Sequence, residues 1–178
     1  NKTVSVVPNF VLEYIMDEMA AKNGIQYKLV SIPAFTARFE ALLADQIDGV
    51  IFTEPQASML VSKGAKVLAT SKEYGMKAGT ILFNGKTLDS NAGEVKAFYR
   101  AYNAAVEYIN TTKSSEYSQV LTKYGFPEAI QGYLGAGVKY TKAQKITNES
   151  FTSVLDWTKK LVEKSYKLED ISNFTFIE

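Results

Sequence analysis

The chain has 178 residues, 46% of them hydrophobic and 22% charged, a composition ordinary for a globular protein long enough to bury a core. Its net charge of +1 gives no basic field to attract nucleic acid and no acidic field to attract a basic partner. It contains neither cysteine nor histidine, which excludes disulfides, thiol nucleophiles, Ser-His-Asp triads and zinc sites built on these residues. Enzyme classes are therefore disfavoured, and we expect no cofactor and no metal.

Strands and helices are predicted to alternate over residues 1–84. Apolar residues at helical spacing mark the helices, the first stripe beginning at Val11 and the second being Phe35, Phe39, Leu42 and Leu43. Alternation at this spacing favours a mostly parallel sheet with right-handed crossovers. The five expected strands cover residues 3–7, 27–32, 49–52, 65–70 and 79–83.

Past residue 84 the pattern becomes helical. One long helix is expected from near Asn91, a second ends at Gly125 and Pro127, and a third carries Trp157 on its apolar face. Residues 174–177 could add one edge strand. Helices with apolar faces this wide, and with no sheet of their own, must cover some other surface.

The segment at residues 41–55, ALLADQIDGVIFTEP, is the most informative in the chain. A helix ends, a polar turn follows, and a buried strand runs directly into a new helix start at Glu54-Pro55. In open α/β sheets, ligands bind outside the carboxyl ends of the strands. The sequence therefore predicts a recognition site at this end of the strand.

This segment resembles the second lobe of ABC-transporter substrate-binding proteins, nearest to the nitrate/sulfonate/taurine and NMT1/THI5-like (thiamine-pyrimidine) group. The segments VKAFYRAYNAAVEYIN and VLDWTKKLVEK are similar to that family's closing helices. The resemblance implies an α/β, periplasmic-binding-protein-like lobe with a mostly parallel five-stranded sheet, followed by a helical C-terminal segment. Residues 1–84 would form lobe two, and residues 85–178 would be helices of lobe one. The first half of lobe one and a secretion signal would lie outside these residues.

The same resemblance implies a non-enzymatic, extracytoplasmic component of an ABC importer, binding a small polar or heterocyclic molecule between two lobes. Its partners would be that molecule and an ABC permease, and any membrane attachment would be a lipid anchor outside this chain. Because its helices would lack part of the surface they cover, the chain by itself is expected to self-associate. Two alternatives are a ligand-sensing domain of a signalling protein and a pyrimidine-synthase-like enzyme, the latter disfavoured because its histidine and cysteine-rich motif have no counterpart here.

If the strand order is 2-1-3, the switch point of the sheet lies between the first and third strands. The loops that leave these strands both run into helix N-termini, which offer free N–H groups and a positive dipole end. The residues predicted to bind ligand are Asn9, Phe10, Thr53 and Glu54, with Tyr74 from the loop at residues 71–78.

Each candidate also has a purely structural interpretation. Asn9 and Thr53 are good helix caps, Phe10 could belong to the core, and Tyr74 could be a surface residue. Glu54 in a first helical turn would stabilise the helix by ~0.3–1 kcal/mol without any ligand. No basic residue is expected near the switch point, because Arg38 is assigned to the second helix. The carboxylate of Glu54 therefore favours a ligand with N–H donors or positive charge, such as an aminopyrimidine.

Overall fold

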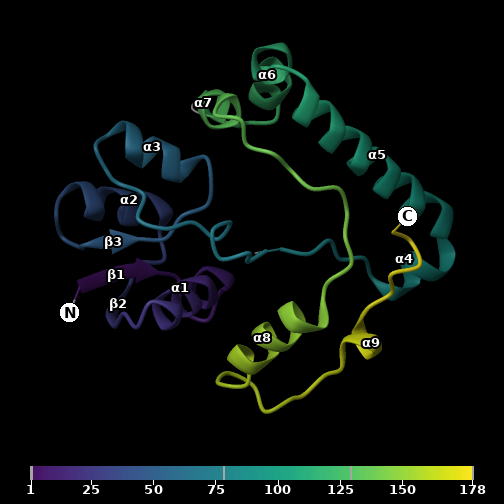
Figure 1. The fold of residues 1–178 in the computed structure, drawn as a ribbon, viewed down its shortest axis with the longest axis horizontal. Helices are drawn as coiled ribbons and strands as arrows, with labels where there is room; N and C mark the ends of the chain where they lie inside the picture. The colour runs from purple at the N-terminus through teal and green to yellow at the C-terminus, as the bar shows by residue number, and fades with distance from the viewer. Residues whose placement is uncertain (1, 78, 129, 178) are drawn as a thin grey trace. The chain divides into compact units, whose positions relative to one another are not determined.

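The structure, a computed structural model, describes residues 2–77, 79–128 and 130–177 (Figure 1). The chain divides into two compact units, Asn1–Gly79 and Thr80–Glu178. The division predicted from the sequence, after residue 84, lies a few residues later in the chain than the division after Gly79 in the structure.

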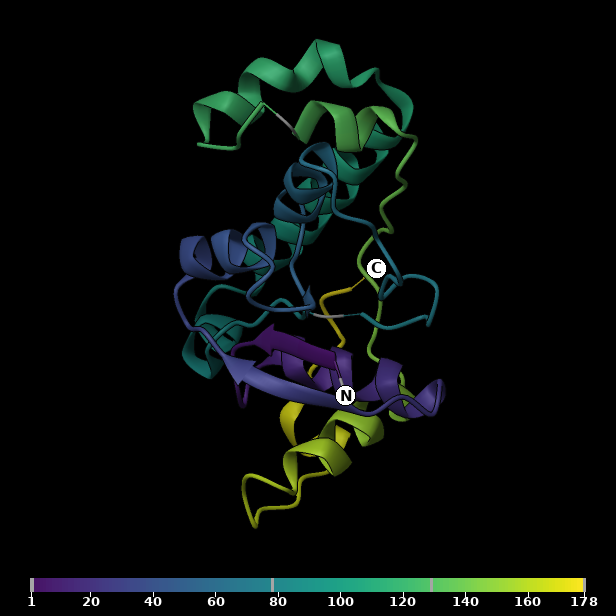
Figure 2. The same ribbon diagram turned by 90° about the vertical axis from the view of Figure 1, so that its left-hand side faces the viewer.

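The first unit is built on a parallel sheet with the order β2-β1-β3. Its strands are β1 (Lys2–Val6), β2 (Tyr27–Ser31) and the short β3 (Gly49–Val50); Figure 2 shows the arrows of β1 and β2 side by side. The central strand is β-branched and apolar on one face, where Val4 and Val6 are buried. The predicted parallel pairing is confirmed, and the 2-1-3 order on which the predicted switch point depends is the one observed.

Three helices pack on this sheet, α1 (Val11–Lys22), α2 (Phe35–Leu43) and α3 (Gln56–Ser62). In Figure 1, α1 lies on one side of the sheet and α2 and α3 on the other, as right-handed crossovers require for this strand order. The expected stripe of α2 is wrong in part, because Arg38 and Ala41 are its buried residues. The buried residues of α1 are Tyr14, Ile15, Met19 and Ala20.

Two of the five expected strands are wrong. Residues 65–70 and 79–83 pair with no strand among the described residues, and the sheet there has three strands. Leu68 is 94% exposed and Leu82 is 85% exposed. A run of β-forming residues becomes a strand only where a neighbouring backbone completes its hydrogen bonds. The expected edge strand at residues 174–177 is likewise absent from the described part of the chain.

The second unit is helical. The predicted long helix, second helix and last helix are confirmed as α5, α6 and α8. Gly125, with φ at 80°, follows α6 in the left-handed conformation that favours glycine. The helices are α4 (Gly85–Ser90), α5 (Ala92–Thr111), α6 (Ser114–Lys123), α7 (Ile130–Gly135), α8 (Asn148–Thr158) and α9 (Leu168–Ile171).

The apolar packing of this unit is local. Val95, Tyr99 and Phe176 form a small buried cluster, and Trp157 is buried on α8. Partly buried hydrophobic residues surround the cluster: Phe83, Leu88, Ala143 and Ile177. None of the helices in the described residues is long and apolar enough to cross a membrane.

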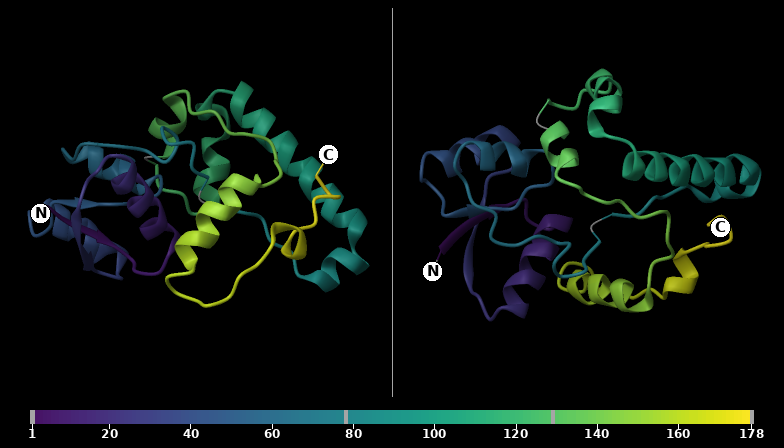
Figure 3. Two further views of the ribbon diagram at one scale, coloured as in Figure 1. Left: turned by 60° about the horizontal axis from the view of Figure 1, so that its bottom comes forward. Right: turned by 45° about the horizontal axis from the view of Figure 1, so that its top comes forward.

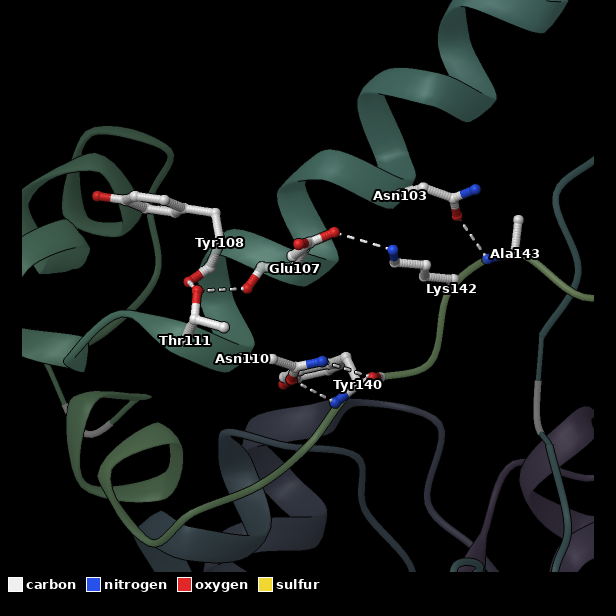
Figure 4. A network of polar contacts seen from close by, with 8 residues as sticks. All are labelled: Asn103, Glu107, Tyr108, Asn110, Thr111, Tyr140, Lys142 and Ala143. Carbon is white, nitrogen blue, oxygen red and sulfur yellow. Dashed lines mark hydrogen bonds and ion pairs between the residues drawn. The ribbon is translucent and has the colours of Figure 1, made fainter. Parts of the chain in front are cut away.

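Polar side chains on α5 hold an extended segment, residues 138–143, beside the helix (Figures 3 and 4). The Asn110 amide pairs with both backbone groups of Tyr140: its Nδ2 donates to the carbonyl oxygen at 2.8 Å, and its Oδ1 accepts from the N–H at 2.9 Å. Asn103 Oδ1 accepts from the Ala143 N–H at 2.8 Å. Together with Glu107, which pairs with a lysine of the segment at 2.9 Å, these residues lie at helical spacing on one face of α5. They give the segment the backbone partners that a sheet would otherwise supply.

Candidate functional site

The carboxyl edge of the sheet carries the two loops that the sequence analysis singled out. β1 ends at Val6 and β3 at Val50, and the two strands are paired neighbours with Ser5 opposite Val50. Just beyond, the Ile51 N–H donates to the Ser5 carbonyl oxygen at 3.4 Å. The loops that follow these strands therefore start side by side at the topological switch point of the sheet.

The residue type and position of Asn9 predict that it is the N-cap of α1, but this prediction is wrong. Phe10 occupies the cap position, with no side-chain cap, and the backbone N–H of Asn9 donates to the Glu13 carboxylate. Asn9 has φ at 58°, in the left-handed region that asparagine tolerates better than most residues. Its side chain makes no hydrogen bond within the described part of the chain. Phe10 is 55% exposed, so it is not a core residue.

Glu54, rather than Thr53, caps the first turn of α3. The helix begins after a cis Glu54-Pro55 bond, and Glu54 Oε2 accepts from the Ser58 N–H at 3.0 Å. Thr53 Oγ1 lies 3.4 Å from Gln56 Oε1, a contact between side chains, so the expected Thr53 cap is wrong. Thr53 is exposed and Glu54 half-buried, so neither side chain belongs to the core.

Tyr74 does not lie with the other four candidates. Its hydroxyl oxygen accepts from Asn23 Nδ2 at 2.7 Å, and Lys22 Nζ lies 5.8 Å from the centroid of its ring. Both partners are at the C-terminal end of α1, whereas Asn9 precedes the N-terminal end. The 12 residues of α1 span about 18 Å. The structure thus brings Asn9, Phe10, Thr53 and Glu54 to one edge of the sheet and places Tyr74 toward the other.

Arg38, assigned from the sequence to the second helix and not to the switch point, also lies at this edge. Only 5% of it is exposed, Nη1 donates to the Ile32 carbonyl oxygen at 3.3 Å, and the guanidinium carbon lies 4.9 Å from the centroid of the Phe52 ring. Ile32 follows β2 and Phe52 follows β3, so the guanidinium connects two loops at the carboxyl edge. Burial lowers the pKa of Arg38 below its ordinary value. The expectation of no basic residue near the switch point was wrong.

An aromatic cluster surrounds this guanidinium. The Phe35 and Phe52 ring centroids are 4.9 Å apart, and Phe39 lies 6.4 Å from Phe35 and 6.5 Å from Phe52. Phe35 is 41% exposed. Arg38 follows Phe35 by three residues, so it occupies the apolar face of α2. A charged residue at such a position is the signal in the sequence that could have revealed it.

Asp48, in the turn before β3, lies at the opposite edge of the sheet. Asp48 accepts from Lys2 Nζ, from the Thr3 N–H and from Thr3 Oγ1, each at 2.7 Å. The hydrogen bond from Lys2, then those from Thr3, hold the pKa of the Asp48 carboxyl well below its ordinary value. Asp48 thus holds the start of β1 to the turn before β3. No group of three or more acidic residues in the described part of the chain could hold a metal ion.

Comparison with known proteins identifies a family and a similar fold. The family model described as NMT1/THI5 like matches residues 1–112. A solved structure, described as the periplasmic sulfonate-binding protein SsuA of a sulfonate ABC transporter from Methylobacillus flagellatus KT, is similar with a TM-score of 0.72 and 13% sequence identity. The alignment covers 99% of this chain and 58% of that one. No curated protein matches the chain.

Proposed function

The chain belongs to the NMT1/THI5-like family, and from this premise we propose that it is the ligand-binding part of an extracytoplasmic solute-binding component of an ABC importer. The similarity to the SsuA structure supports the periplasmic-binding-protein-like fold. This chain spans 58% of that protein's length. The activity and partners of the whole protein are therefore part of the proposal.

The single observation that carries the proposal is the arrangement at the switch point. Two neighbouring strand ends place Asn9, Phe10, Thr53 and Glu54 at one edge, where open α/β sheets bind their ligands. Asn9 and Phe10 contribute little to the core or to capping. Their exposure at this edge is better explained by contact with a small molecule than by fold stability.

In the proposed protein, residues 1–84 form lobe two and residues 85–178 supply helices of lobe one. Ligand would bind in the cleft and shift the equilibrium between open and closed forms, which an ABC permease would read. No catalytic role is proposed, because the chain has neither histidine nor cysteine. A lipid anchor outside these residues would account for attachment to the outer face of a membrane.

The test is the Glu54→Gln variant of the protein in the longest form that its gene encodes. If Glu54 accepts a hydrogen bond from the ligand, calorimetric titration with the co-purifying ligand should show a loss of roughly 1.5–3 kcal/mol of binding free energy. Glu73→Gln is the matched control, because Glu73 Oε2 accepts a backbone N–H from Thr70 at 2.7 Å away from the proposed site. Unchanged affinity with a lowered melting temperature would show that Glu54 stabilises the start of α3 and does not bind the ligand.

A further inference from the structure

The Arg38 guanidinium is a buried positive charge without a negative partner. Among the described residues it forms no ion pair, and its Nε has no hydrogen-bond partner despite being fully buried. Glu54, the acidic residue of the neighbouring loop, directs its carboxylate to the Ser58 N–H. A buried cation left in this state costs free energy that a paired or hydrogen-bonded cation does not.

The position of Arg38 points to what could pair with it. The guanidinium lies between the Ile32 carbonyl oxygen and the Phe52 ring, both in loops at the carboxyl edge, where Asn9 and Glu54 also lie. Phe52 covers one face of the guanidinium, and the partly exposed Phe35 packs on Phe52. Because Arg38 Nε is fully buried, a molecule bound at this edge could reach it only if these two rings moved aside.

We propose that the ligand of this lobe carries an oxyanion group, and that Arg38 is the residue that selects ligands for that charge. The inference rests on the proposed solute-binding function and deepens it. A guanidinium presents several N–H donors in a fixed plane that matches the oxygens of a carboxylate or sulfonate. Its Nε is the donor left without a partner. An oxygen of the ligand's anionic group would thus accept the hydrogen bond that Arg38 Nε does not make within the protein.

The experiment compares ligands of nearly equal shape that differ in charge. Methanesulfonate is titrated against methanesulfonamide, and benzoate against benzamide, into the protein in the longest form that its gene encodes. At least one anion should bind about tenfold or more tightly than its neutral counterpart, as expected for a hydrogen bond to a charged group. Arg38→Met should abolish this preference, and Arg38→Lys should retain part of it. Lys63→Met, which removes an exposed charge beyond the C-terminus of α3, is the control and should keep it.

Folding of the variants is checked by circular dichroism. Arg38→Met should fold, because it replaces an unpaired buried charge with an apolar side chain of similar length. The charge preference of the unmodified protein needs no variant at all. Equal binding of the anion and the neutral molecule in both pairs, or a preference that survives Arg38→Met, would overturn the inference. If no anion binds while the co-purifying ligand proves to be neutral, the inference fails and the proposed function stands; if nothing binds, both fail.

Discussion

The two units of this chain position their backbones by different means. In the first unit, paired strands form a sheet, and apolar side chains such as Val6 and Ile15 are almost completely buried against it. In the second unit, the 20-residue helix α5 buries three residues and leaves Phe98 43% exposed, while asparagine side chains hold residues 138–143. Where a sheet satisfies the backbone, apolar burial determines the packing. Where no strand is available, polar side chains form the hydrogen bonds to the backbone instead.

The largest effect should come from the core of the first unit. Ile15 is 3% exposed, so Ile15→Ala should lower the free energy of unfolding by about 2–5 kcal/mol, because the cavity adds to the lost burial. Urea denaturation followed by circular dichroism measures it. Leu68→Ala is the matched control: the sequence pattern assigns Leu68 to a strand, but the residue is 94% exposed, and the loss should stay within about 0.5 kcal/mol. Equal losses would mean that residues 65–70 are packed after all.

A smaller and more local effect is expected in the second unit. Asn110→Ala removes the partner of both backbone groups of Tyr140, which should lower the free energy of local opening by roughly 1–3 kcal/mol. Amide hydrogen exchange at Tyr140 measures this, and proteolysis after Lys139 or Lys142 should accelerate in parallel. Asn103→Ala removes one such bond and should have a smaller effect. Unchanged exchange at Tyr140 would show that other contacts hold the segment.

The smallest effect should be pH-dependent and confined to the first unit. The pKa of Asp48 is held below its ordinary value of 3.8, so its stabilising contribution is complete above that value and is lost as the pH falls through the folded-state pKa. Asp48→Asn should therefore lower the melting temperature at neutral pH, and the difference from the unmodified protein should shrink in acid. Asp45→Asn removes the same charge from the same turn and should change the melting temperature less. A difference that persists in acid would contradict this assignment.

The arrangement of the first sheet was predictable because it follows from order along the chain. Alternating strands and helices, combined with right-handed crossovers, leave few possible topologies, and β2-β1-β3 is one of them. That order alone brings the loops of Asn9 and Glu54 to one edge. The second unit's helices were likewise predictable from apolar spacing.

What could not be predicted depends on neighbours that lie far away in the sequence. The segments at residues 65–70 and 79–83 have strand-like composition, but composition does not say whether a partner strand is present. Asn9 is a good cap by residue type, yet its backbone at φ 58° moves the cap to Phe10. Arg38 was assigned to the second helix and set aside from the switch point, although its buried guanidinium connects two loops at that edge.

The one tryptophan of the chain, Trp157, has a consequence for how ligand binding can be observed. It is buried on α8 of the second unit, whereas the residues proposed to contact ligand belong to the first. Within these 178 residues, tryptophan emission therefore reports on the second unit. A change in the emission of Trp157 on adding ligand would show that the surroundings of α8 change on binding, and an unchanged emission with measurable heat of binding would show that they do not.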